Sequence, residues 1–220
     1  MTRYLNIHTH QPEKAEDVFS IRNIEIPTGI PPEEWSEGGA CSIGIHPRNI
    51  NGKRLPEYLH FIEQHLPSAC VKAIGECGLD RLCETPRELQ LQTFRLQIGL
   101  SEKFRKPVII HCVKAFDELI ALHKEIQPQQ SWIIHGFRGK PQQMQQLVKQ
   151  GFYLSFGIHF NEETLRKMPL ERLFLENDDA GISIKQVYQN ALNPIACTEE
   201  TLSAQIAQNM ENCRLNQINS

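Results

Sequence analysis

The chain has 220 residues, of which 40% are hydrophobic and 22% are charged, and its 23 Lys and Arg against 26 Asp and Glu give a formal net charge of −3. Its mean hydropathy is −0.40 and its pI is about 6.3. This composition supports a packed core and excludes a generally basic nucleic-acid coat protein, although a local positive patch is still allowed. The length suits one large domain, so we expect residues 1–220 to form a single domain.

Neither a secretory signal nor a membrane span is expected from the sequence. The opening residues lack a cationic segment followed by an apolar run, and no stretch approaches the roughly 20 apolar residues that cross a bilayer. The seven cysteines are scattered without a CxxC pair, which is typical of reduced thiols. The sequence therefore predicts a cytoplasmic protein that does not act at a membrane, and it gives no sign of an obligate protein partner.

Short apolar runs rich in β-branched residues alternate with helical patterns along the chain. Runs such as VIIH and WIIH are apolar at consecutive positions, as in strands that a parallel sheet buries on both faces. In chain order we expect strands at 4–8, 19–26, 40–45, 71–76, 108–111, 132–135, 152–156 and 173–176. Apolar residues at helical spacing predict helices at 86–101, 114–123, 140–149, 162–168 and 198–213.

Eight strands alternating with helices predict an α/β fold of the (β/α)8 type, a TIM-type barrel. The sequence contains no internal repeat and no linker that would divide it. Residues 27–39, which are rich in Pro and Gly, form the main irregular insertion.

Polar side chains gather at the ends of five of the predicted strands. Active-site residues of such barrels come from the carboxyl ends of several strands. A polar residue at an otherwise apolar strand end is costly unless it is paired or coordinated. The residues concerned are His8, His10, Glu76, His111, His135 and Asp178.

Four imidazoles and two carboxylates suit Zn²⁺ and other first-row divalent ions, and Mg²⁺ or Mn²⁺ is also compatible. One catalytic zinc normally takes three protein ligands, so a set of six favours two ions that share a bridging carboxylate. Two such ions, about 3.5–4 Å apart, activate a hydroxide and clamp the substrate oxygens. We therefore expect two divalent metal ions, either Zn, Mn or Mg.

The order of these residues resembles the TatD family of metal-dependent hydrolases and deoxyribonucleases, within the amidohydrolase-like barrels. The resemblance runs from residue 4 to about residue 213, and its most specific elements are GECGLD and HGFRG. The family's D-x-H-x-H, G-x-H-P, G-E-x-G-L-D, strand-five His, H-C-F-x-G and E-T-D elements correspond in turn to 6–10, 44–47, 75–80, His111, 135–139 and 176–178.

The resemblance implies roles for the six residues. One ion would be held by His8, His10, Glu76 and Asp178, and the other by Glu76, His111 and His135, with Glu76 as the bridge. Asp178 and Glu76 would be the catalytic residues, and Asp178 would be the general base toward the nucleophilic water. The implied activity is hydrolysis of phosphodiester bonds, with DNA trimmed from an end, or a small phosphodiester, as the substrate.

Two further residues are candidates for binding the substrate. His46 precedes Pro47 after a predicted strand, and Arg138 adjoins His135 and carries a fork suited to bidentate phosphate contact. A turn histidine and a solvated surface arginine are the competing interpretations of these two positions.

The chain departs from the family pattern at three places. Asn6 replaces the usual Asp, so a neutral amide would replace any carboxylate that supports a histidine there, a change that commonly costs about 10–100-fold in metal affinity or activity. Val113 stands where the family has an Arg, which removes a phosphate contact. Residues after Asp178 read Asp-Ala-Gly where the family usually continues Ala-Pro.

These departures leave two other functions open. The acidic pI and Val113 favour a barrel that keeps the metal site but hydrolyses an amide or an ester. Asn6 favours a catalytically weak barrel that binds a metal or a nucleotide and serves as an interaction module.

Overall fold

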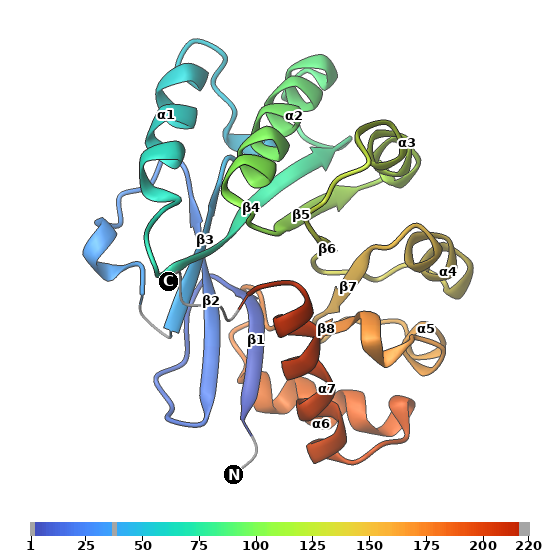
Figure 1. Ribbon diagram of the computed structural model, residues 1–220. Coiled ribbons are helices and arrows are strands. Elements are labelled where there is room, and N and C mark those ends of the chain that lie inside the picture. The colour runs from blue at the N-terminus through green and yellow to red at the C-terminus, as the bar shows by residue number, and fades with distance from the viewer. Residues whose placement is uncertain (1–2, 37–38, 216–220) are drawn as a thin grey trace.

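The computed structural model describes residues 3–36 and 39–215, and in it eight parallel strands form one sheet in the order β1 to β8 (Figure 1). Strands adjacent in the chain are adjacent in the sheet, which curves into a nearly closed TIM-type barrel. All eight predicted strands are present. Their bounds are β1 Tyr4–Thr9, β2 Val18–Glu25, β3 Gly39–Gly44, β4 Val71–Asp80, β5 Val108–Val113, β6 Trp132–Ile134, β7 Tyr153–Phe156 and β8 Leu173–Leu175. However, β4 runs four residues beyond its predicted end at residue 76.

The helices pack around the outside of the sheet, and most of them follow β3 (Figure 1). The five predicted helices are confirmed within three residues of their expected ends. The structure also defines α1 and α6, for which we predicted no bounds, and α6 contains Pro194. The helices are α1 Leu55–His65, α2 Arg87–Phe104, α3 Phe116–Ile126, α4 Pro141–Lys149, α5 Glu162–Arg166, α6 Ile184–Ile195 and α7 Glu199–Asn212.

The first two connections depart from the predicted alternation of strand and helix. β1 and β2 are joined by residues 10–17, fewer than the dozen or so that a helical crossover needs. β2 and β3 are joined by a segment that contains a short 3-10 helix, Pro32–Glu34. These two units therefore lack their α-helix.

The predicted insertion 27–39 packs against the outside of the barrel over the part that the structure describes; residues 37 and 38 lie outside the described residues. The buried ring of Trp35 contacts Phe61 and His65 of α1, with ring centroids 6.0 and 5.1 Å apart. Trp35 also donates its Nε1–H to the Ile30 carbonyl at 2.9 Å. This segment therefore covers apolar surface that a helix would otherwise cover.

The barrel closes at Asp178, immediately after β8. The backbone N–H of Asp178 donates to the His8 carbonyl, and its own carbonyl accepts from the N–H of His10, both at 3.2 Å. Asp178 has φ +51°, in the left-handed region that Asp tolerates better than most residues. The closure brings Asp178 beside the two histidines of β1.

Glycine backbones allow β3, β4 and β5 to approach closely near the carboxyl ends of these strands. A Cβ on Gly44 would lie 2.8 Å from the carbonyl carbon of Gly75. A Cβ on Gly78, where φ is +145°, would lie 2.1 Å from the carbonyl oxygen of His111. The close approach holds the carboxyl ends of three strands together.

The apolar core fills the barrel interior and the layer between sheet and helices. All ten residues of β4 are buried, as expected for a strand covered on both faces. No helix in the described part of the chain combines the length and the apolar character that crossing a bilayer requires.

Candidate metal centre

The six predicted ligands converge at the carboxyl ends of the strands. The donor atoms of these residues and of His46 fall into three groups, and within each group all atoms lie within 4.8 Å of one another. The groups are His8, His10 and Glu76; His8, His135 and Asp178; and His46, Glu76 and His111. A cavity of about 300 Å³ opens above them. It is lined by His10, Glu25, His46, Arg48, Asn49, Glu76, His111, His135, Asp178 and Asp179.

Glu76 lies at the centre, and its two oxygens face different histidines. Oε1 is 2.7 Å from Nδ1 of His111 and 2.7 Å from Nε2 of His135. Oε2 is 3.5 Å from Nε2 of His8. On that second side, Oδ1 of Asp178 lies 3.4 Å from Nε2 of His8 and 3.5 Å from Nε2 of His10. The division is the one expected of a carboxylate that bridges two ions.

His8 provides a direct test of whether the site fits a metal ion. Its side chain is fully buried, and neither ring nitrogen has a hydrogen-bond partner. Burying a polar group without a partner is costly, and 3.4–3.5 Å separates its Nε2 from two carboxylates. Imidazole nitrogens and carboxylate oxygens are suitable ligands for divalent metals. The residues therefore fit a divalent ion.

The pKa values of the histidines and carboxylates in this centre also indicate that it favours positive charge. Burial disfavours the charged imidazole of His8, yet Asp178 and Glu76 raise its pKa to about 9. Glu76 and Glu176 likewise overcome burial and hold the pKa of His135 well above its ordinary value. Burial works against ionisation of Glu76 and Asp178 as well, but the surrounding histidines lower the pKa of both carboxyl groups. Protons on the histidines and divalent cations would compete for this site.

Two carboxylates that we did not assign from the sequence support the histidines on one side of Glu76. Oδ2 of Asp80 is 3.2 Å from Nε2 of His111, and Oε1 of Glu176 is 3.3 Å from Nδ1 of His135. Such partners fix the tautomer of a histidine ligand and orient its ring. Both belong to motifs already noted, GECGLD and END, and Asp80 became recognisable only once β4 proved to extend to that residue.

The side chain of Asn6 pairs with Asn177. Asn6 donates its Nδ2–H to Oδ1 of Asn177 at 2.8 Å, and its own Oδ1 accepts the backbone N–H of Asn177 at 3.3 Å. Asn177 in turn donates from Nδ2 to the Ile182 carbonyl at 2.8 Å. This donor role fixes the amide of Asn177, so its Oδ1 requires a donor at position 6. Asn6 and Asn177 thus complement each other.

His46 lies in the cavity but differs from the other histidines. Its Nδ1 accepts the backbone N–H of Arg48 at 3.1 Å, so its Nε2 carries the proton in the neutral ring. That nitrogen is 3.4 Å from Oε1 of Glu76. His46 is therefore a hydrogen-bond donor toward Glu76 and the cavity. Its donor atoms also lie close enough to those of Glu76 and His111 for the three residues to bind one metal ion together.

The structure does not bring Arg138 into the lining of this cavity; its side chain is exposed. Arg48, which we did not single out from the sequence, lines it instead. Its Nε and Nη2 donate to Oδ2 of Asp80 at 3.3 and 3.2 Å. Among the described residues that line the cavity, Arg48 is the one with a permanent positive charge.

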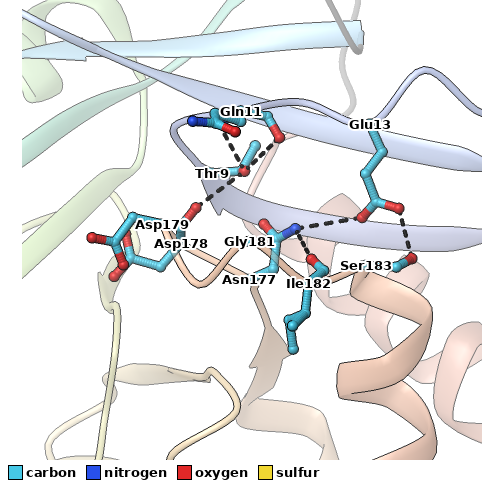
Figure 2. A pocket seen from close by; sticks show the side chains of 9 residues that line it. All are labelled: Thr9, Gln11, Glu13, Asn177, Asp178, Asp179, Gly181, Ile182 and Ser183. Atoms are coloured by element: carbon cyan, nitrogen blue, oxygen red, sulfur yellow. Dashed lines mark hydrogen bonds between the residues drawn. The ribbon is translucent and has the colours of Figure 1, made fainter.

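A second cavity of about 250 Å³ adjoins the first across Asp178 and Asp179, which line both (Figure 2). Glu13 borders its other end, where Ser183 donates its Oγ–H to Oε2 at 2.6 Å and Ile184 its backbone N–H to Oε1 at 2.5 Å. The carboxylate thereby stabilises the N-terminus of α6. This cavity is bordered by carboxylates, unlike the end of the first cavity beside Arg48.

Comparisons with known proteins agree with this geometry. The family model described as "TatD related DNase" matches residues 33–214. The chain is 32% identical over 147 residues to the "Uncharacterized metal-dependent hydrolase YabD" of Bacillus subtilis, covering 63% of this chain and 57% of that protein. It is 31% identical over 147 residues to the "3'-5' ssDNA/RNA exonuclease TatD" of Klebsiella pneumoniae, covering 61% and 55%.

Among solved structures, the TatD homologue YjjV of Escherichia coli superposes with a TM-score of 0.79 at 19% identity, over 97% of this chain and 98% of that one. This likeness bears on the fold. In sequence, the chain matches little more than half the length of the curated relatives named above. Because the family model covers most of the residues, the chain belongs to the family of TatD related DNases.

Proposed function

We propose that this protein is a metal-dependent phosphodiesterase that removes nucleotides from an end of DNA. The observation that carries the proposal is the position of Glu76, whose Oε1 faces His111 and His135 and whose Oε2 faces His8. The ligands we propose are His8, His10, Glu76 and Asp178 for one ion, and Glu76, His111 and His135 for the other. A relative whose name specifies a single-stranded DNA and RNA exonuclease supports this substrate class.

Divalent ions bound at these residues would lower the pKa of a water molecule and polarise a phosphodiester oxygen. Asp178 is half-buried between the two cavities, where its carboxylate faces His8 and His10. We assign to Asp178 the role of general base, which accepts the proton of the attacking water. His46 directs its Nε2–H into the cavity and donates to a substrate oxygen.

We propose that Arg48, rather than Arg138, binds the substrate phosphate. Asp80 accepts two N–H groups of the guanidinium and holds it at the rim of the cavity, which leaves its Nη1 donors for an anion. The other end of the cavity continues into the space bordered by Glu13, Asp178 and Asp179, where a phosphate would be repelled. This polarity supports a substrate that places its phosphate toward Arg48 and an uncharged terminal group toward Asp179.

A cytoplasmic location and a single domain belong to the same proposal. All seven cysteines are free thiols, as expected in a reducing compartment. The sheet is continuous from β1 to β8, which supports one domain.

The experiment that tests the function uses the full chain, stripped with a chelator and reloaded separately with Mn²⁺, Mg²⁺ or Zn²⁺. Single-stranded DNA labelled at either end and an aryl phosphodiester are the substrates, and a panel of esters and amides is run in parallel. We expect cleavage of the phosphodiesters that depends on the metal and shortens DNA from one end. Turnover of esters or amides without phosphodiester cleavage would overturn the proposal in favour of an amidohydrolase.

The phosphate contact is tested by comparing Arg48→Gln with Arg138→Gln. A charge-assisted hydrogen bond is worth about 1.5–3 kcal/mol, so the KM of the first variant should rise by about tenfold or more. Arg138→Gln removes the same charge from an exposed position outside the cavity and should leave KM unchanged. The opposite result would restore Arg138 as the phosphate ligand and remove Arg48.

A further inference from the structure

Two cysteines, Cys41 and Cys70, lie near the amino-terminal ends of the strands, opposite the metal centre. Cys41 is at the start of β3, and Cys70 directly precedes β4. The proposed metal ligands lie in the carboxyl-terminal halves of their strands or just beyond them, whereas the two cysteines lie near the amino-terminal ends of β3 and β4. The cysteines therefore take no part in the chemistry proposed above.

The backbone places the two cysteines at disulfide distance. The N–H of Cys41 donates to the carbonyl oxygen of Cys70 at 2.9 Å. Covalent geometry then limits the separation of their Cα atoms to at most about 6.8 Å. Disulfides usually join residues whose Cα atoms are about 4.4–6.8 Å apart. The two thiols interact as well, since a hydrogen bond between them shifts the pKa of each.

The surroundings of Cys70 stabilise a thiolate. Its Sγ lies 3.2 Å from the hydroxyl oxygen of Ser68. The buried ammonium of Lys106 donates to the carbonyl of the adjacent Val71 at 2.6 Å, and the buried Lys72 is two residues away. The hydrogen bond from Cys41, assisted by Ser68 and Lys72, lowers the pKa of Cys70 to about 5 despite its partial burial. Reactive cysteines typically occupy such electropositive, partly exposed positions.

The two cysteines differ in access to solvent. Cys70 is half-buried, whereas Cys41 is fully buried and lies in register with Arg22 of β2. Cys70 is thus the more accessible residue of the pair. An exposed attacking thiolate with a neighbouring resolving thiol is the usual arrangement of a redox-sensitive pair.

The other cysteines lack this combination. Burial raises the pKa of Cys112 to about 12, and it also raises the pKa of Cys197. Cys83 is half-buried, and its thiol contacts the Asp80 carbonyl and the amide of Gln90. These three half-buried thiols are therefore internal controls.

We propose that Cys41 and Cys70 form a thiol–disulfide modification site that reacts with low-molecular-weight disulfides of the glutathione type. The Cys70 thiolate attacks one sulfur of the reagent, forms a mixed disulfide and releases one thiolate. Cys41 then loses its proton, attacks the sulfur of Cys70 and releases the second thiolate. The protein thus loses two electrons and two protons, and the reagent is reduced to two thiols. The product ties the start of β3 to the start of β4.

The test treats the full chain with a small molar excess of oxidised glutathione. The products are then identified by intact-mass measurement and peptide mapping. We expect the wild-type protein to lose two hydrogen atoms and to yield a linked pair of peptides containing Cys41 and Cys70. Cys41→Ser should instead stop at one glutathione on Cys70, and Cys70→Ser should form neither product at these positions. The matched control, Cys197→Ser, should behave as the wild type does.

Glutathione on Cys83, Cys112 or Cys197 at a rate equal to that on Cys70 would overturn the proposal. A stable mixed disulfide on Cys70 of the wild-type protein would overturn the role of Cys41. Mapping of the wild-type protein gives the answer without a variant, so misfolding of Cys41→Ser would leave the test intact.

Discussion

The histidines on the two sides of Glu76 are held in different ways. Asp80 and Glu176 contact the outer nitrogens of His111 and His135 at 3.2 and 3.3 Å. His8 has no hydrogen-bond partner on either nitrogen, and the ring of His10 is more than one-third exposed. Outer partners orient a ligand and make it a stronger donor. The comparison indicates that, of the two proposed ions, the one at His111 and His135 is held more tightly.

The largest effect is expected from removing the carboxylate of Glu76, which both sides share. We expect Glu76→Gln to abolish binding of both ions and to lower phosphodiesterase activity by about 1000-fold or more, because metal stabilisation of the transition state is worth several kcal/mol. Metal content and activity are the measurements. Glu25→Gln, which alters a carboxylate in the same cavity that accepts from Asn49, should keep both ions. Loss of one ion alone in Glu76→Gln would argue against a bridge.

The comparison is sharpened by changing the support of one side. Glu176→Gln should lower the affinity for the ion at His111 and His135 by about 10–100-fold, the usual effect of losing a carboxylate that supports a histidine ligand. The ion at His8 and His10 should be unaffected, so it acts as a control within the same protein. Calorimetric titration with Zn²⁺ resolves the two steps. Equal weakening of both would show that the two sides are not independently supported.

A smaller effect is expected from pH. The pKa of His8 in the metal-free protein is about 9, above the ordinary value near 6.5. The stability contributed by its proton is therefore complete below about pH 6.5 and is lost as pH rises through about 9. A metal must displace this proton, so its apparent affinity should rise between pH 7 and 9 by up to about tenfold per unit for each proton released. Titrations in two buffers of different ionisation enthalpy count the protons, and an affinity independent of pH would contradict the assignment.

The smallest effect on catalysis, and a measurable one on stability, is expected at Asn6 and Asn177. Asn6→Asp replaces the donor facing Oδ1 of Asn177 by an acceptor and should cost about 1–3 kcal/mol of unfolding free energy. The double variant Asn6→Asp with Asn177→Thr, which restores the family pair, should recover most of that loss. Denaturant unfolding of the metal-free variants measures the coupling. Additive losses would show that the two positions are independent.

The strands and most of the proposed ligands were predictable because their pattern is local. Short apolar runs rich in β-branched residues mark the buried strands, and a His or Glu at the end of several of them marks the carboxyl end. His8 and His135 lie together because parallel strands of a barrel end at the same edge. The helix α6 was missed although its buried residues Ile184, Val187 and Ala191 follow helical spacing.

The features that the sequence did not reveal depend on contacts between distant segments. Asn6 and Asn177 meet where β1 and β8 close the barrel, and no local pattern records that their amides complement each other. Arg48 points into the cavity because Asp80 holds it, and Asp80 lies beyond the predicted end of its strand. Cys41 and Cys70 lie close together because of the register between β3 and β4.

The close approach at Gly78 limits how such a barrel can diversify. Any side chain there would have to displace the carbonyl of His111, 2.1 Å away, and would carry a proposed ligand with it. The spacing of β4 and β5 at this point therefore cannot change without moving His111. Changes of substrate specificity are instead expected in the loops that follow the strands, where Arg48 and Asp179 already give the two ends of the cavity opposite charge.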